Sequence, residues 1–297
     1  TDMVDLSLFK SLISEKYNDT PLALYFHENQ LCYPWSKTDR DVQKNRDSHY
    51  GFINFSSALV ADKVFFNSYF HKNAFLGALP NFLKGFPDYN ELDSIKKIKE
   101  KSEVLHLGMD LQKFDKYKCK VNSKPLILWN HRWEYDKNPK DFFKALYKMQ
   151  EKNLDFEVVI LGENFKKIPE EFEIAKEKLK DKILFMGYAD SFKDYATWLW
   201  KAHILPVTSN QDFFGGSVVE AIYCNCYPIL PKRLAYPEHL PSQTECFYNS
   251  FELLCQKLEN EILNFNNLEN LDATVKKYDW KIIIKEYDKK LEQIKKP

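Results

Sequence analysis

The chain has 297 residues, which is enough for two domains of ordinary size, each with its own buried core. Its 43 basic and 43 acidic side chains cancel, so no global field marks it for nucleic acid or membranes, and a polyanion site has to be a local patch. The six cysteines lack C-x-x-C spacing, and the sequence has no signal peptide or run of eighteen apolar residues, which favours a cytoplasmic protein with free thiols.

Apolar segments of strand length alternate with amphipathic segments along the chain. Eight segments have strand character: Leu22–Phe26, Lys63–Phe66, Val104–Leu107, Leu126–Trp129, Val158–Leu161, Ile183–Met186, Ile204–Val207 and Tyr227–Leu230. This alternation is typical of βαβ units and predicts an α/β fold with parallel sheets. The polar stretch from Leu111 to Lys124 suits a linker, so we expect two domains, residues 1–117 and 118–297. An amphipathic helix at about 280–295 is expected to pack back onto the first domain.

The sequence opens Thr1-Asp2-Met3, and the segment Pro21–Phe26 already has the character of an interior parallel strand. We therefore expect the first domain to be incomplete at its N-terminus. A glycine-rich loop, absent after this first strand, would belong to the missing part.

Polar side chains follow the first strand directly. The sequence His27-Glu28-Asn29-Gln30 places four hydrogen-bonding groups where, in a doubly wound sheet, ligands bind. Such a row suits sugar hydroxyls. A structural histidine with satisfied hydrogen bonds is the alternative.

A second polar segment follows the strand Leu126–Trp129. Here Arg132 and Lys137 are expected to converge above the sheet, where a guanidinium and an ammonium together neutralise a diphosphate. The alternative is a solvated loop in which Arg132 pairs with Asp136.

The third segment places the carboxylates of Asp212 and Glu220 eight positions apart around Gly215 and Gly216, where a strand passes into a helix. Backbone N–H groups at a helix start attract anions, although any α/β protein puts glycines at such turns. Gly187, after the strand Ile183–Met186, allows the backbone to approach a base. There is no Walker lysine motif, no G-x-S-x-G elbow and no clear metal-binding cluster.

Together these motifs resemble a known family. The pattern Arg132-x4-Lys137 followed by Asp212-x7-Glu220, with Phe214-Gly215 inside it, resembles the retaining, nucleotide-sugar-dependent glycosyltransferases of the GT-B fold. The strings Tyr25–Pro34, Trp129–Lys137 and Tyr223–Pro228 resemble the tRNA-queuosine α-mannosyltransferase family most closely. The resemblance implies two Rossmann-like, doubly wound parallel-sheet domains facing a cleft.

The resemblance also implies roles for individual residues. Arg132 and Lys137 match the pair that holds the donor diphosphate. Asp212 takes the place of a Glu that contacts the transferred sugar, and Glu220 matches the carboxylate that accepts from the ribose hydroxyls. The backbone N–H groups of Gly215 and Gly216 are implied to contact the sugar and phosphate, and Gly187 and Tyr188 are implied to contact the donor. His27 is implied to reach the sugar from the first domain. Glu28 and Asn29 are implied to contact the acceptor.

The implied donor is GDP-mannose, and the implied acceptor is the cyclopentenediol of queuosine in tRNA-Asp. Transfer with retained configuration by front-face attack needs neither a metal nor another cofactor. Asp212 is one methylene shorter than the expected Glu, which leaves two alternatives open: a transferase that uses another nucleotide sugar and a glycan or small-molecule acceptor, and an inactive nucleotide- or tRNA-binding module. Two lysine clusters, at 96–101 and 176–182, are either tRNA-binding surfaces or solvated helix faces.

Overall fold

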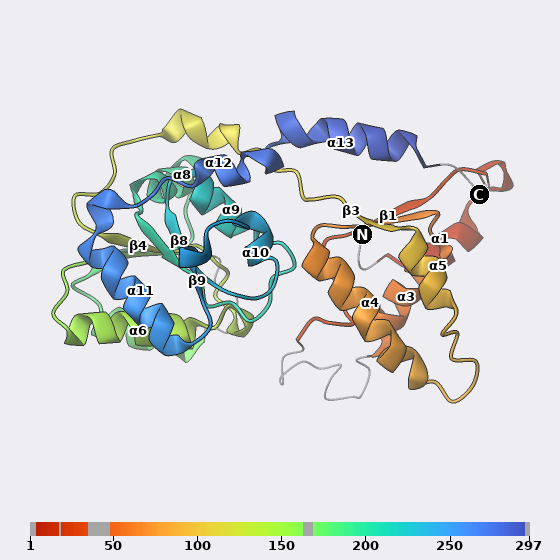
Figure 1. Ribbon diagram of the computed structural model, residues 1–297, viewed down its shortest axis with the longest axis horizontal. Coiled ribbons are helices and arrows are strands. Elements are labelled where there is room, and N and C mark those ends of the chain that lie inside the picture. Colours follow the sequence, from red (N-terminus) through yellow and green to blue (C-terminus); the bar gives the residue numbers. More distant parts are fainter. Residues whose placement is uncertain (1–3, 18, 35–47, 163–168, 295–297) are drawn as a thin grey trace. The chain divides into compact units, whose positions relative to one another are not determined.

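A computed structural model describes residues 4–17, 19–34, 48–162 and 169–294 of the chain. These residues form two compact units (Figure 1). Unit 1 comprises the chain up to Gly108 together with the residues from Ile283 onward, and unit 2 comprises Met109–Ile282.

Unit 1 is built on a three-stranded parallel sheet in the order β1-β2-β3. Its strands are β1 (Ala23–Phe26), β2 (Lys63–Phe66) and β3 (Ser102–Val104), and its helices are α1 (Leu6–Leu12), the short 3-10 helix Glu15–Tyr17, α3 (Ser48–Val60), α4 (Tyr69–Lys84) and α5 (Ser94–Glu100). Figure 1 shows α3, α4 and α5 on one side of this sheet. Strand alternation explains the layers, because Leu24 and Phe26 point into the core with these helices, whereas Tyr25 points to the other face.

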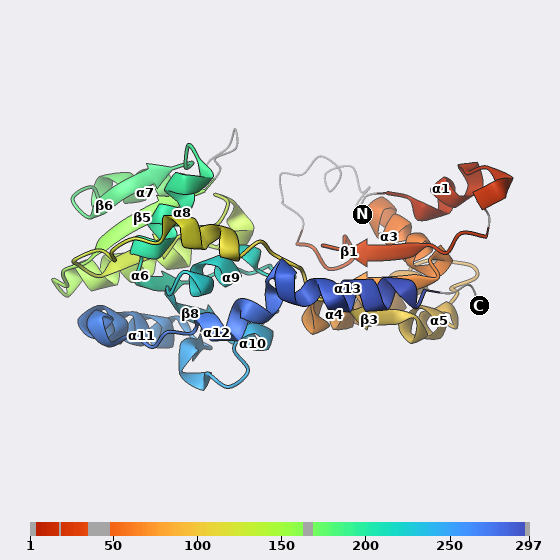
Figure 2. The same ribbon diagram turned by 90° about the horizontal axis from the view of Figure 1, so that it is seen from above.

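That other face contacts helix α13 (Trp280–Glu292), whose residues from Ile283 onward belong to unit 1. The rings of Tyr25 and Tyr287 stack with centroids 6.2 Å apart, and the hydroxyl of Tyr287 donates to the carbonyl of His106 at 2.9 Å. Lys290 pairs with Glu103 of β3, and Figure 2 shows α13 running alongside this strand. The last residue of the expected helix, 295, lies outside the described residues.

The predicted strand at 104–107 is wrong in its bounds, since β3 begins two residues earlier, at Ser102, and ends three residues earlier, at Val104. Leu105 still donates its N–H to the carbonyl of Phe66 at 2.9 Å, but the apolar residues beyond it leave the sheet. The apolar sequence pattern predicts which residues of this segment are buried. Which residues form strand hydrogen bonds depends instead on where the neighbouring strand ends.

Unit 2 contains a six-stranded parallel sheet in the order β6-β5-β4-β7-β8-β9. Its strands are β4 (Leu126–Trp129), β5 (Glu157–Leu161), β6 (Ile183–Gly187), β7 (Ile204–Pro206), β8 (Tyr227–Pro231) and β9 (Phe247–Tyr248). This is the doubly wound order 3-2-1-4-5-6, which confirms the predicted α/β fold. Strand order reverses between β4 and β7, so the crevice for a ligand lies at their carboxyl ends.

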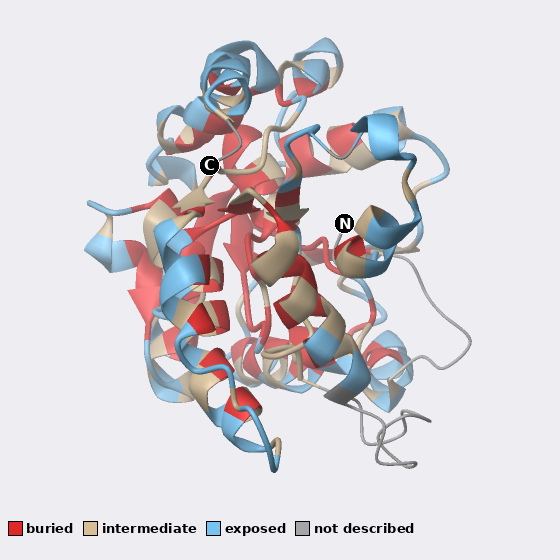
Figure 3. Cartoon of the chain, turned by 90° about the vertical axis from the view of Figure 1, so that its right-hand side faces the viewer, coloured by how far each residue is buried: buried red, intermediate tan, exposed pale blue. Residues whose placement is uncertain are grey.

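The helices of unit 2 cover both faces of the sheet (Figure 1). They are α6 (Pro139–Glu151), α7 (Glu170–Lys178), α8 (Phe192–Lys201), α9 (Gly216–Tyr223), α10 (Tyr236–His239), α11 (Phe251–Leu263) and α12 (Asp272–Val275), with short 3-10 helices at Gln112–Tyr117, Tyr135–Lys137, Thr244–Cys246, Phe265–Asn267 and Lys276–Tyr278. One core cluster joins α6, α7 and α11 to the inward side chains of β4 and β5. All four residues of β4 and the last four of β5 are buried. Figure 3 colours the described residues by burial and shows buried residues, in red, on strands and on one side of many helices.

The segment expected to be an interdomain linker belongs to unit 2. Phe114 is buried, its ring lies 4.9 Å from that of Phe192, and its carbonyl accepts from Trp200 Nε1 at 2.9 Å. The division between the units therefore falls after Gly108, whereas the sequence suggested a boundary near residue 118. Polar composition alone does not reveal the two aromatic contacts that hold this stretch.

Cys32, Cys119, Cys224, Cys226, Cys246 and Cys255 are free thiols, and the last four are buried. Within the described part of the chain, no three His, Cys, Asp or Glu side chains are grouped as metal ligands would be. None of the helices in the described ranges has the length and apolar character needed to cross a membrane.

Candidate functional site

The loop after β4 is anchored by an aromatic side chain. The ring of Trp133 stacks on Phe172 of α7 with centroids 4.4 Å apart, and its indole N–H donates to the carbonyl of Leu161. Gly162 fits beneath this loop, because a Cβ on it would lie 2.2 Å from the carbonyl oxygen of His131. The φ of Gly162 is +146°, which also favours glycine. The absence of a side chain on Gly162 thus allows the loop His131–Trp133 to pack against the end of β5.

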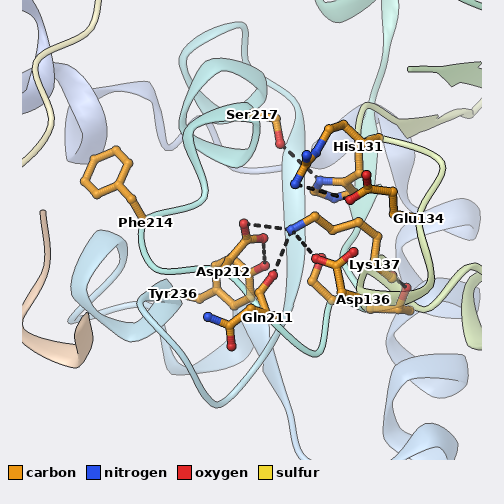
Figure 4. A network of polar contacts seen from close by, with 12 residues as sticks. His131, Glu134, Asp136, Lys137, Gln211, Asp212, Phe214, Ser217 and Tyr236 are labelled. Atoms are coloured by element: carbon orange, nitrogen blue, oxygen red, sulfur yellow. Dashed lines mark hydrogen bonds and ion pairs between the residues drawn. The ribbon is translucent and has the colours of Figure 1, made fainter. Parts of the chain in front are cut away.

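Lys137 lies at the end of this loop, with its ammonium in the interior of the unit. Asn138 adopts φ +53° and caps helix α6, and the hydroxyl of Thr208 donates to the carbonyls of Lys137 and Asn138. The Lys137 Nζ donates to the carbonyl of Gln211 at 2.8 Å and lies 3.0 Å from Asp212 Oδ1 and 3.2 Å from Asp136 Oδ2 (Figure 4). The loops after β4 and β7, adjacent at the switch point, are therefore joined by one buried cation.

Both oxygens of Asp212 are engaged. Oδ1 accepts from Lys137, and Oδ2 accepts from the hydroxyl of Tyr236 at 2.5 Å. Burial on its own would raise the pKa of Asp212, but Lys137, His131 and the hydrogen bond from Tyr236 together hold that pKa below its ordinary value. The pKa of Lys137 is raised, because Asp212 and Asp136 outweigh the opposing effect of burial. Asp212 and Lys137 are thus a fixed anion and cation at neutral pH.

His131 lies beside this pair. Its Nδ1 is 3.1 Å from the hydroxyl of Ser217 at the start of α9, and burial lowers the pKa of His131 to about 4. The imidazole is therefore neutral near pH 7. Its Nε2 is buried and has no hydrogen-bond partner among the described residues. Because buried polar atoms are normally hydrogen-bonded, this nitrogen is a candidate for contact with a ligand.

The glycine turn, defined here as Phe214-Gly215-Gly216, leads into α9. Gly215 adopts φ +82°, and a Cβ on it would lie 3.0 Å from the ring of Tyr236. The N–H groups that open a helix have no acceptor within it, and the helix dipole makes this end favourable for anions. Since Lys137, His131 and Ser217 lie around the same end of α9, the site is suited to a negatively charged ligand (Figure 4).

A cavity of about 360 Å³ lies at the carboxyl ends of β5 and β6, and Asn130 in its wall donates to the carbonyl of Ser217 in α9 at 2.7 Å. It is lined by Asn130, Leu161, Gly162, Tyr188, Ala189, Asp190, Ser191, Phe192 and Tyr195. The hydroxyl of Tyr195 donates to Glu220 Oε2 at 2.6 Å, so the second carboxylate of the motif is tied to the cavity wall. Burial raises the pKa of Glu220, against the hydrogen bond from Tyr195 and the charge of Lys113.

Arg132 and Lys137 differ in their surroundings. Arg132 Nη2 pairs with Glu134 Oε2 at 3.2 Å, and its side chain is 49% exposed, whereas that of Lys137 is 9% exposed. The carboxylate of Asp136 pairs with Lys137, so the suggested surface pair of Arg132 with Asp136 is wrong. Gly187 lies at the end of β6 with φ +152°, and the adjacent Tyr188 is 67% exposed at the rim of the cavity.

The remaining predicted residues lie in unit 1, after β1. His27 is exposed, and its ring lies 4.9 Å from that of Tyr25. Glu28 accepts from Gln30 Nε2 at 3.1 Å. Asn29 is fully buried and accepts from the N–H of Cys32 at 3.0 Å, so its side chain stabilises the loop.

Several residues of the site had no role in the sequence-based prediction. They are His131, Asp136, Ser217, Tyr195 and Tyr236, of which the first three were within a quoted motif. Tyr236 is 24 positions from Asp212, and no spacing signal connects the two. The proximity of His131 to Arg132 and Lys137 was the one signal that pointed to its involvement.

Comparison with known proteins finds similar sequences for most of the chain. Residues 1–109 match the family described as tRNA-queuosine alpha-mannosyltransferase N-terminal, and residues 112–241 match glycosyl transferases group 1. The chain is 39% identical over 246 residues to a tRNA-queuosine alpha-mannosyltransferase of Drosophila melanogaster. The chain is thus similar to tRNA-queuosine alpha-mannosyltransferases over most of its length. The alignment covers 80% of the chain and 63% of the Drosophila protein, so the chain spans less than two thirds of that relative.

Solved glycosyltransferase structures share the fold. Anabaena HepE in complex with UDP-glucose superposes with a TM-score of 0.66 and 15% identity, covering 92% of this chain and 72% of that one. A glycosyltransferase of Rickettsia africae gives a TM-score of 0.65 at 17% identity, covering 99% and 81% of the two chains. These likenesses confirm the predicted GT-B fold.

Proposed function

We propose that the chain is a retaining glycosyltransferase that transfers mannose from GDP-mannose to the cyclopentenediol of queuosine in tRNA-Asp. The match of residues 1–109 to the family described as tRNA-queuosine alpha-mannosyltransferase N-terminal and the 39% identity to the Drosophila protein support this reaction. The observation that carries it is the buried contact of Lys137 with Asp212 beside the glycine turn, which provides a cation, an anion and helix-start N–H groups in one place. A tRNA acceptor places the reaction in the cytoplasm.

The diphosphate of the donor is proposed to bind between Lys137, Arg132 and the N–H groups of Gly215 and Gly216. The ammonium is fixed by three oxygen atoms, and such preorganised charge stabilises a departing diphosphate without the cost of reorienting water. Arg132, which is half-exposed, is available to move onto the ligand. This arrangement supplies the positive charge that a metal ion would otherwise provide.

The transferred sugar is proposed to lie between Asp212 and His131. Asp212 uses two of its lone-pair directions for Lys137 and Tyr236, and a carboxylate has about four, so hydroxyl groups of the sugar have acceptors left. His131 Nε2 provides a neutral partner without a competing protein contact among the described residues. The shorter side chain of Asp212 relative to Glu is compensated by Tyr236, which holds the carboxylate in one orientation.

The base of the donor is proposed to occupy the cavity at the ends of β5 and β6. Its volume of about 360 Å³ and its aromatic side chains Tyr188, Phe192 and Tyr195 suit a stacked nucleobase. Asp190 contributes a carboxylate, which accepts from the adjacent N1–H and N2–H groups of guanine and is repelled by the carbonyl oxygens of uracil. Glu220, tied to Tyr195, then receives the ribose hydroxyls.

Unit 1 is proposed to bind the acceptor, with His27 reaching the sugar and Glu28 and Asn29 belonging to the acceptor side. In a front-face reaction the bond from the sugar to the leaving phosphate breaks as the bond to the acceptor oxygen forms. The departing phosphate oxygen takes the proton of the acceptor hydroxyl, so no separate base is needed.

The decisive experiment incubates the protein with GDP-mannose and queuosine-containing tRNA-Asp and then measures the nucleoside masses. A hexose mass gain on queuosine is expected, and an identical reaction with tRNA that lacks queuosine serves as the control. An unchanged queuosine mass, with a protein that binds GDP, would reject the proposed acceptor.

The base assignment has its own test. Xanthine has an oxygen in place of the N2 amine of guanine. Asp190→Asn is therefore expected to lower the affinity for GDP and to raise the affinity for xanthosine diphosphate, each by about tenfold, which is close to the value of one hydrogen bond to a charged group. Glu177→Gln, on the exposed face of α7, is the control and leaves both affinities unchanged. Equal binding of GDP and UDP by the unaltered protein would exclude guanine selectivity.

A further inference from the structure

His239 is a buried residue that contacts the glycine turn from behind. It is 1% exposed and lies at the end of α10, between the glycine turn and the segment that precedes α13. Its Nε2 is 2.6 Å from the carbonyl oxygen of Phe214, and its Nδ1 is 3.0 Å from the hydroxyl of Tyr278. Both ring nitrogens are therefore engaged.

The contacts define the proton positions. A carbonyl oxygen only accepts, so Nε2 carries the hydrogen and donates to Phe214. In the neutral imidazole Nδ1 then accepts from the hydroxyl of Tyr278. The three rings also meet edge to face, with centroid separations of 5.1 Å for Phe214 with His239, 5.1 Å for Phe214 with Tyr278 and 5.3 Å for His239 with Tyr278.

This arrangement fixes one peptide plane. The carbonyl of Phe214 belongs to the peptide whose N–H is that of Gly215, so the hydrogen bond from His239 sets the direction of that N–H as well. Gly215 is the left-handed residue of the turn and has the conformational freedom to turn elsewhere if the constraint is removed. On the other side of the turn, the side chain of Met109 lies 3.5 Å from the position of a Cβ on Gly216.

We propose that His239 is a positioning residue: with Tyr278 behind it, it holds the N–H groups of the glycine turn in the direction that binds the phosphate and sugar of the donor. The proposal rests on the proposed function, since it assumes that the glycine turn binds the donor. It gives His239 no contact with the ligand. Its effect is confined to the phosphate and sugar, because the base cavity is lined by other residues.

The test compares GDP-mannose with guanosine, which carries the base and ribose but no phosphate. His239→Leu is expected to lower the affinity for GDP-mannose by about tenfold or more, which is comparable to the value of one charge-assisted hydrogen bond. The affinity for guanosine is expected to change by less than about twofold. His239→Gln, whose amide still donates toward Phe214, is expected to recover most of the loss. His203→Leu is the matched control, since His203 is also buried and bonded to a backbone N–H, that of Leu126, away from the turn.

The turn itself can be observed. The chain has eight glycines, so labelling glycine with nitrogen-15 gives a spectrum of eight amide signals, of which those of Gly215 and Gly216 are expected to shift in His239→Leu and stay in place in His203→Leu. Should His239→Leu not fold, Tyr278→Phe, which retains the ring and removes only the hydroxyl, is expected to weaken GDP-mannose by about threefold with guanosine unchanged, a fraction of one neutral hydrogen bond.

The outcomes separate the two proposals. Failure of the unaltered protein to bind GDP-mannose would reject the proposed function. Binding by the unaltered protein together with equal binding by His239→Leu, or a parallel loss of guanosine in that variant, would overturn the role of His239.

Discussion

Removing the ammonium of Lys137 is the sharpest perturbation of the site. In Lys137→Met the side chain keeps most of its length and apolar stem, but two carboxylates, those of Asp136 and Asp212, lose their cation. Their side chains are 1% and 17% exposed, so water replaces the lost partner only in part. Breaking a buried ion pair in this way costs about 3 to 5 kcal/mol of unfolding free energy.

The pH dependence provides the signature. In the unaltered protein the pKa of Asp212 is lowered, so its contribution to stability is present above the unfolded pKa of about 3.9 and is lost as the pH falls through the folded value. In Lys137→Met burial, the largest effect at this carboxyl, is no longer offset by the ammonium, and the pKa of Asp212 should rise above about 3.9. The variant then gains stability relative to the unaltered protein as the pH is lowered.

Urea unfolding followed by tryptophan fluorescence at pH 7.5 and pH 3.5 measures both effects. The destabilisation is expected to shrink by about 1 kcal/mol or more on acidification, because one pKa unit is worth about 1.4 kcal/mol and most of it is regained once the pH lies below both pKa values. Lys124→Met is the control, because its pair with Asp155 has side chains 48% and 69% exposed and, as a surface ion pair, contributes little to stability. A destabilisation by Lys137→Met that matches this control, or one that is the same at both pH values, would refute the buried-charge reasoning.

Three further predictions concern neighbouring residues. Gly162→Ala forces a Cβ to within 2.2 Å of the carbonyl of His131 and should cost about 1 to 3 kcal/mol in thermal unfolding, while Gly77→Ala in α4, where nothing lies within 4 Å, should stabilise by about 0.5 to 1 kcal/mol; equal effects would contradict the close approach. Tyr236→Phe removes a hydrogen bond to Asp212 and should cost about 1.5 to 3 kcal/mol and raise the pKa of Asp212, so that this loss is larger at pH 7 than at pH 3, where the carboxyl takes up its proton; a pH-independent loss would argue against it. Arg132→Ala should change stability by less than about 1 kcal/mol, since its pair with Glu134 is half-exposed, yet lower turnover by about 10²- to 10³-fold; near-normal turnover would remove Arg132 from the donor site.

The sequence by itself determined most of the sheet architecture. Interior parallel strands are buried on both faces, so they appear as continuous apolar runs, and seven of the eight predicted strands overlap the observed strands almost completely. The prediction failed at β3, where an apolar run continues beyond the pairing, and missed β9, whose two residues are too short for a pattern. Motif spacing likewise placed Lys137, Asp212 and the glycine turn after strands that end together.

Only the tertiary structure decided how these groups are held. The contacts of Lys137 with Asp136, Gln211 and Asp212 join residues up to 75 positions apart. Tyr236 contacts Asp212, and His239 contacts Phe214, across loops whose sequences carry no periodicity. Local sequence spacing predicts which residues follow the end of a strand. The burial, hydrogen-bond partners and pKa of a side chain depend on its neighbours in the folded protein, and these come from elsewhere in the chain.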